Sequence, residues 1–141
     1  MLLFTLAVLV ACVREPHVVV KTAAGPVRVN VEVANTPQSR ELGLMYRRDM
    51  AADAGMLFIF PGESRQAFWM KNTPLSLDMI FIDAAHKIVG IVPDARPFST
   101  KSLGVSTPSK YVLEVHAGFC TQHGIAAGDQ IELADVADSA R

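Results

Sequence analysis

The residues best suited to chemistry lie in one short segment, FWMKNTPLSLD, residues 68–78. Polar and charged side chains are interspersed there with large apolar ones, which is usual neither for a core strand nor for a surface loop. An isolated buried charge is costly, so Lys71 and Asp78 should either pair with each other or face a cleft. Because Pro74 lies between them and can turn the chain, we predict an ion pair of Lys71 with Asp78 across that turn.

Two interpretations of this segment remain open. In the structural one, Asn72 and Thr73 bond backbone groups and serve only to fix the turn. In the functional one, the segment lines a cleft that binds a small polar or anionic ligand. In that cleft Trp69 would supply a stacking ring, and Lys71 and Arg47 would be cationic donors. Asn72 would supply an amide and Asp78 a carboxylate.

A second group of candidate residues, His116, Cys120 and His123, follows the spacing i, i+4, i+7. On one continuous helix these side chains would share a face and could bind a soft metal ion. However, residues 111–115 alternate in the manner of a strand, so His116 should end a strand instead of joining that helix. We therefore predict no metal site and no cofactor, and we expect Cys120 to be a buried, unpaired thiol. The sequence also lacks a glycine-rich phosphate loop, a Gly-x-Ser-x-Gly elbow and a paired-cysteine zinc motif.

Length and charge limit the classes of protein to which the chain can belong. Its 141 residues are 50% hydrophobic and 19% charged, which suits a single globular domain with a real core. The net charge is -1, and the only adjacent basic residues are Arg47 and Arg48. Because neutralising nucleic-acid phosphates requires a basic face, we expect no nucleic-acid partner. We expect the protein to be a monomer.

The N-terminal sequence MLLFTLAVLVAC predicts export. Its apolar run is too short to span a bilayer as a helix, which takes about 20 residues, but it matches the core of a signal peptide. The final four residues, LVAC, resemble the lipobox of bacterial lipoproteins, in which the cysteine is lipidated. We therefore expect a signal peptide over residues 1–11, a lipid on Cys12, a tether over residues 12–17 and a location at the cell envelope. The alternative is that this run forms a first buried element of the domain.

The remaining sequence predicts mostly strands. Residues 18–22 should form a strand, and residues 27–33 alternate apolar with polar side chains after a turn, so the two runs predict an antiparallel hairpin. Residues 56–60 are apolar on both faces and should stop at Pro61-Gly62. Further strands are expected at 78–83, 87–93, 111–115 and 130–133, a long loop at 94–109 and a flexible tail at 135–141.

Helices are expected in two places. The segment NTP at residues 35–37 is a typical helix start, and that helix should run to about Tyr46, with Leu42, Met45 and Tyr46 as its apolar stripe. Residues 117–123 should make one or two further turns. Together these elements predict an α+β fold that is predominantly antiparallel β, with one domain over residues 18–134. We expect a compact rolled or barrel-like sheet with one main short helix and a second helical turn.

Several blocks of the sequence resemble the bacterial and archaeal family known as domain of unknown function 192. They are RELGLMYR (40–47), GMLFIFP (55–61), FWMKNTPLSLDMIFID (68–83), YVLEV-AG (111–118) and GIAAGDQI (124–131). The resemblance implies a compact β-rich domain, often exported, with no established activity. It marks motif positions without supplying their roles: Arg47, Trp69, Met70, Lys71, Asn72, Thr73, Asp78 and Glu114. One departure is His86, where similar family hairpins often carry Gly.

The sequence therefore favours an envelope protein that binds a small polar or anionic ligand without transforming it. One alternative is a hydrolase or lyase in which Asp78 is the base and Lys71 stabilises charge. Another is a structural or assembly factor that holds a protein partner on the apolar surface around Trp69.

Overall fold

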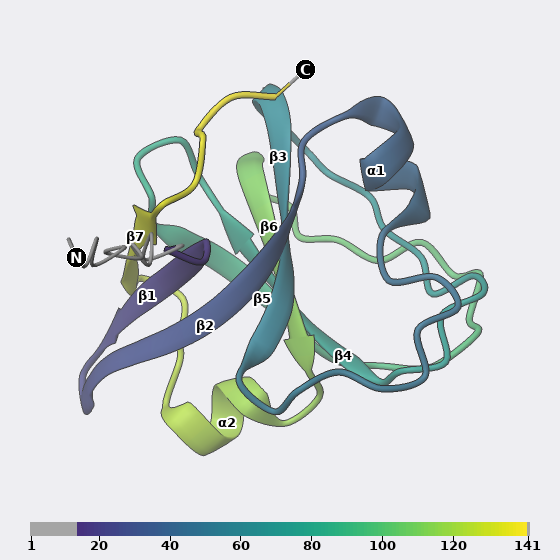
Figure 1. The fold of residues 1–141 in the computed structure, drawn as a ribbon, viewed down its shortest axis with the longest axis horizontal. Coiled ribbons are helices and arrows are strands. Elements are labelled where there is room, and N and C mark those ends of the chain that lie inside the picture. Colours follow the sequence, from purple (N-terminus) through teal and green to yellow (C-terminus); the bar gives the residue numbers. More distant parts are fainter. Residues whose placement is uncertain (1–13, 141) are drawn as a thin grey trace, which may run out of the picture.

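A computed structural model describes residues 14–140, and within this range seven strands form one curved sheet accompanied by two short helices (Figure 1). Cys12 and the predicted signal peptide lie outside the described residues. The strands are β1 (His17–Thr22), β2 (Gly25–Ala34), β3 (Ala54–Ser64), β4 (Leu77–Ile82), β5 (Ile88–Ala95), β6 (Ser109–His116) and β7 (Gln130–Ala134). The helices are α1 (Pro37–Leu42) and α2 (Phe119–His123).

The strand order β5-β4-β6-β3-β2-β1-β7 makes β5 and β7 the two edges of the sheet. Every neighbouring pair is antiparallel except β2 and β3, which are parallel because α1 carries the chain across between them. The two edges meet at one end, where Lys87 bridges to Gln130 and the Ile131 N–H donates to His86 O at 2.9 Å. The sheet therefore curls into a half-barrel, which confirms the predicted α+β, mainly antiparallel, rolled architecture.

Each face of the curled sheet carries a layer of apolar side chains. Strand β4 is buried along its whole length, including its one charged residue, Asp78. Alternate residues of the central strands pack inside the half-barrel, among them Leu57, Ile80 and Leu113. Their neighbours form a second core on the other face, made chiefly by Met56, Phe58, Met70, Met79, Phe81 and Val112.

Long connections cover this second core. They are residues 43–53, 65–76 and 96–108, which gather beside α1 on the right of Figure 1. The last two are joined by a bridge between Phe68 and Leu103 and by the Met70 N–H, which donates to Ser99 O at 2.8 Å. The FWMKNT segment is thus part of a lid of loops and not a strand of the sheet.

The helix α1 begins where the sequence predicts and ends earlier. Thr36 is its N-cap, with a Thr36–Ser39 capping box and Pro37 in the first turn. It stops at Leu42 because Gly43 adopts a positive φ of 48°. The predicted apolar stripe is wrong: α1 buries no residue, and Leu42 and Tyr46 are 53% and 69% exposed.

Two other boundaries differ from those expected. Strand β3 continues through Pro61-Gly62 to Ser64, where it pairs again with β6 after an irregularity in register. The β4–β5 turn accepts His86 in the left-handed region at φ 64°. The Lys87 N–H stabilises this turn by donating to Asp83 Oδ1 at 2.9 Å.

Beyond β7, residues 135–140 contact the sheet: the Tyr111 hydroxyl donates to Asp138 Oδ1 at 2.6 Å, and Val136 packs on the core.

The predicted ion pair between Lys71 and Asp78 is wrong. Asp78 lies in β4, is 1% exposed, and accepts hydrogen bonds from two backbone N–H groups, those of Asp94 and Cys120, each at 3.0 Å. Lys71 is exposed, and its Nζ lies 5.1 Å from the centroid of the Trp69 ring. The loop between them turns Lys71 to solvent, while β4 carries Asp78 to the end of β5 and the start of α2. Asp78 therefore acts as a clamp between elements.

We predict that Asp78→Ala lowers the free energy of unfolding by about 2–4 kcal/mol, because it leaves two N–H groups without their charged acceptor. Lys71→Met should change it by less than about 0.5 kcal/mol, as should the exposed control Asp49→Ala. Chemical denaturation of Asp78→Ala, Lys71→Met and the double variant measures this directly. A coupling energy between the two sites above the experimental error would contradict the separation of Lys71 from Asp78.

Candidate functional site

A hollow of about 250 Å³ lies over the second core, between α1 and the FWMKNT segment. Buried residues form its inner part, including Phe58 and Glu114, and exposed residues form its rim, including Leu42 and Trp69. Its complete lining is Arg40, Glu41, Leu42, Gly43, Leu44, Met45, Phe58, Phe60, Ala67, Phe68, Trp69, Thr73 and Glu114. The hollow therefore joins four segments that are distant in sequence: α1 with its following turn, β3, the motif segment and β6.

Glu114 is the charged group at the inner end of this hollow. It lies in the central strand β6, opposite Met56 of β3 and Met79 of β4, and it is 4% exposed. The close approach of β3 at this point requires Gly55, since a Cβ there would clash with the Glu114 carbonyl oxygen. The strand pairing thus fixes the Glu114 backbone and directs its side chain into the second core.

The carboxyl of Glu114 has no hydrogen-bond or ion-pair partner among residues 14–140. Burial alone raises its pKa from the ordinary value of 4.5 to about 8. At neutral pH the group is therefore mostly protonated and can donate a hydrogen bond into the hollow. The carboxyl opens onto the hollow, since the side-chain oxygen of residues 14–140 that is both fully enclosed and without a partner is Ser109 Oγ.

Aromatic rings surround the entrance to this carboxyl. Phe68 meets Phe58, Phe60 and Phe81 edge to face, with ring centroids 5.0, 6.1 and 6.1 Å apart. These contacts attach the first residue of the FWMKNT segment to the sheet. They also place Trp69, the next residue, at the rim, where it is 48% exposed.

The remaining motif residues shape the rim. Thr73 is buried, lines the hollow, and donates from Oγ1 to Lys71 O at 3.0 Å. Asn72 adopts a positive φ of 53°, and its side-chain amide donates to the Tyr46 hydroxyl at 3.1 Å. The Tyr46 N–H in turn donates to Asn72 O at 2.7 Å. Asn72 therefore ties two loops together through the Tyr46 hydroxyl, whereas the structural interpretation expected its side chain to bond backbone groups. Met70 fills the second core.

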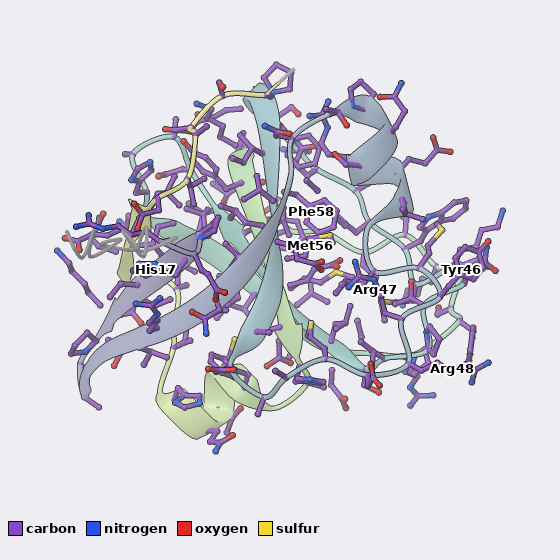
Figure 2. The ribbon with its side chains drawn as sticks, in the orientation of Figure 1. His17, Tyr46, Arg47, Arg48, Met56 and Phe58 are labelled. Carbon is purple, nitrogen blue, oxygen red and sulfur yellow. The ribbon has the colours of Figure 1, made fainter. Side chains whose placement is uncertain are left out.

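Arg47 lies apart from this group. Its guanidinium forms a two-point salt bridge with Glu32, with N–O distances of 2.8 and 3.2 Å, and it lines a different hollow beside Asp49 and Met50. In Figure 2, Tyr46 and Arg48 lie at the outer edge of the loops, whereas Met56 and Phe58 lie on β3 near the middle of the sheet. Of the residues proposed from sequence, the structure brings Trp69, Thr73 and Glu114 to one hollow, with Lys71 over the Trp69 ring. It separates Arg47 and Asp78 from them.

Several lining residues were not singled out from the sequence, namely Arg40, Glu41, Phe58, Phe60 and Phe68. Arg40 donates to Ile59 O at 2.9 Å, and its guanidinium carbon lies 5.4 Å from the Phe60 ring centroid. One sequence signal was available for the inner end of the site: Glu114 is the one acidic residue within the otherwise apolar stretch YVLEV.

The candidate metal residues do not converge. His116 ends β6, and its Nε2 lies 2.6 Å from Met50 O, while Cys120 is buried at the start of α2. Burial, followed by the nearby Asp78, raises the pKa of the Cys120 thiol to about 12, which leaves it unreactive near neutral pH. Within residues 14–140, no group of three or more His, Cys, Asp and Glu side chains has an arrangement that could hold a metal ion.

No helix within residues 14–140 is long and apolar enough to cross a membrane.

The raised pKa of Glu114 predicts a pH-dependent stability. Between about pH 4.5 and pH 8 the unfolded chain releases this proton while the folded chain keeps it. The contribution of Glu114 to the free energy of unfolding therefore falls as pH rises through that window, and it levels off above it. Between pH 5 and pH 8 we expect the free energy of unfolding of Glu114→Gln to rise by about 3 kcal/mol relative to that of the wild type. Denaturation at both pH values tests this, with the exposed rim variant Glu41→Gln as the matched control. Equal pH dependence in the wild type and in Glu114→Gln would contradict it.

Two crystal structures share this fold. One, from Sinorhizobium meliloti 1021, is of a protein called a candidate transcription regulator; it is 42% identical, with a TM-score of 0.82 and coverage of 87% of this chain and 96% of that one. The other is a protein of unknown function from Novosphingobium aromaticivorans DSM 12444, 31% identical, with a TM-score of 0.80 and coverage of 82% of this chain and 83% of that one. A comparison with curated proteins finds no match.

A family model covers most of the chain. It is DUF192, described as "Uncharacterized ACR", and it matches residues 18–133. This range includes all seven strands apart from His17, the first residue of β1, and Ala134, the last residue of β7. The matched range contains the hollow and the FWMKNT segment on its rim. The chain belongs to the domain of unknown function 192 family.

Proposed function

We propose that this protein binds a small polar ligand in the hollow between α1 and the FWMKNT segment and does not transform it. The observation that carries this proposal is the Glu114 carboxyl, which is buried, lines the hollow and has no partner among the described residues. A ligand group that bonds to this carboxyl would replace its lost hydration. Trp69 at the rim would cover an apolar or planar part of the same molecule.

The size of the hollow limits the ligand. A volume of about 250 Å³ corresponds to roughly eight water molecules at about 30 Å³ each. Such a space accepts a small molecule or one end of a longer one. An anionic ligand, expected from the sequence, has less support, because Arg47 is paired with Glu32 and lies elsewhere.

A catalytic role has one observation in its favour. A carboxyl with a pKa of about 8 can act as a general acid or base near neutral pH, and Glu114 is such a group. Asp78, the base expected from sequence, is unsuited to that role because backbone N–H groups occupy both of its oxygens. Lys71 lies on the Trp69 ring instead of beside Asp78. Binding therefore has more support than hydrolysis or elimination.

Two other roles have weaker support. The name of the Sinorhizobium relative suggests regulation of transcription. The charge of this chain, with 13 basic and 14 acidic residues, offers no general attraction to nucleic acid. A protein partner held on the apolar surface around Trp69 would use the same exposed rim, which includes Leu42.

The hollow is tested with the intrinsic fluorescence of Trp69, the single tryptophan of the chain. We expect small polar compounds to change this fluorescence saturably in the wild type. Ala67→Phe should abolish the change, because it adds a ring to the lining of the hollow. Ala85→Phe, in the exposed β4–β5 turn, is the matched control and should bind like the wild type. Equal binding by Ala67→Phe and Ala85→Phe would refute the hollow as the site.

We also propose that the protein is exported and held at the cell envelope by a lipid on Cys12. The support is the LVAC sequence that follows an apolar run.

Cys12→Ser tests the anchor. The variant should move from the membrane fraction to the aqueous fraction on cell fractionation, because it lacks the thiol that carries the lipid. Cys120→Ser, which changes the buried cysteine, is the control and should stay in the membrane fraction. A Cys12→Ser protein that remains in the membrane fraction would show that the apolar run anchors the chain without lipid.

A further inference from the structure

We propose that the hollow selects organic cations and that an alkylammonium or guanidinium group of the ligand pairs with Glu114. This inference rests on the proposed binding function and adds the charge class of the ligand. Three features of the hollow support it: the unpartnered carboxyl, the rings around it and the charges that line the same space.

The unpartnered carboxyl is the first reason. Glu114 is 4% exposed, and Met56 and Met79 flank it on the neighbouring strands, so no described polar group compensates for its burial. A cationic donor offers both a hydrogen bond and an opposite charge, and charge-assisted bonds are roughly twice as strong as neutral ones. An anion at the same place would meet a carboxyl in a poorly hydrated setting and would be repelled once that carboxyl ionised.

The aromatic lining is the second reason. Phe58, Phe60, Phe68 and Trp69 all line the hollow, and the faces of such rings attract cations. Two side chains of the protein already use this attraction at the rim: the Arg40 guanidinium lies 5.4 Å from the Phe60 centroid, and the Lys71 ammonium lies 5.1 Å from the Trp69 centroid. Aromatic rings combined with a carboxylate form a common environment for ammonium recognition.

The balance of charge is the third reason. The charged residues that line the hollow are Arg40 and Glu41 on α1 and Glu114 on β6. Arg40 is already bound to Ile59 O and to the Phe60 ring, and Glu41 adds a second carboxyl at the exposed rim. With the Lys71 ammonium on the Trp69 ring at the same rim, the surrounding charges balance once Glu114 is ionised, and the ionised carboxyl is the charge at the buried inner end of the hollow.

Pairing with a cation links ligand binding to proton release. The free protein holds a proton on Glu114 up to about pH 8, and an ion pair requires that this proton leave to the solvent. The affinity for a cation should therefore rise with pH up to about pH 8. A neutral ligand that accepts a hydrogen bond from protonated Glu114 would show the opposite trend, so the sign of the pH dependence separates the two.

The test uses the full-length chain and four probes of similar size: n-butylammonium, n-butylguanidinium, n-butanol and n-butyrate. Trp69 fluorescence and titration calorimetry measure their affinities at pH 6 and pH 8. We expect both cations to bind more tightly than n-butanol and n-butyrate at pH 8. Their affinity should rise by about fiftyfold from pH 6 to pH 8, since the ionised fraction of a carboxyl with a pKa of about 8 rises from about 1% to about one half. Calorimetry in buffers of different ionisation enthalpy should show release of up to one proton.

Variants assign the effect to the carboxyl. Glu114→Gln keeps the shape of the side chain and should remove both the preference for cations and the pH dependence. Ala67→Phe keeps Glu114 and should weaken all probes, which separates loss of charge from loss of space. Ala85→Phe should match the wild type in every measurement.

Two outcomes would overturn the inference. If n-butanol or n-butyrate binds as tightly as the cations, or if cation affinity falls from pH 6 to pH 8, cation selection is refuted while the hollow remains a binding site. If no probe binds at millimolar concentration and Ala67→Phe is indistinguishable from the wild type, both this inference and the proposed function are refuted.

Discussion

The need to cover the second apolar face of the sheet controls the rest of this structure. The central strands β3, β4 and β6 place Met56, Phe58, Met79 and Phe81 on a face that the half-barrel does not enclose. The helix beside that face, α1, has six residues and buries none of them, so it cannot cover the face. Loops must do so, and they succeed because Phe68 and Met70 insert apolar side chains from the FWMKNT segment.

This way of covering the face explains the mixed composition of the motif. Alternate residues of the segment have different surroundings: Phe68 and Met70 pack downward on the sheet, whereas Trp69 and Lys71 lie at the surface. Asn72 and Thr73 then satisfy backbone and side-chain groups in the turn that follows. A loop that packs on a sheet by alternate side chains leaves hollows between its ends and the neighbouring helix, and the hollow over Glu114 is one of these.

Glu114 and Asp78 show two different uses of a buried carboxyl. Asp78 has donors for both oxygens and connects β4 to the end of β5 and the start of α2, so its burial contributes to stability. Glu114 has no such donors, and its burial opposes stability above its ordinary pKa. Groups that reduce stability in this manner are concentrated at functional sites, which is why the proposed ligand is placed at Glu114 and not at Asp78.

The sequence by itself determined the local structure of this protein. Alternation with period two located strands such as β2, uninterrupted apolar runs located others such as β3 and predicted a rolled sheet, and NTP located the start of α1, because these signals depend on neighbouring residues. Tertiary structure decided which side chains meet. The Asp78 carboxylate bonds to Cys120, 42 residues later, and not to nearby Lys71, and Arg47 bonds to Glu32, because strand pairing and loop packing set these contacts. The surroundings of Glu114 likewise come from α1, β3 and the motif loop, and no pattern along the chain encodes how those segments converge.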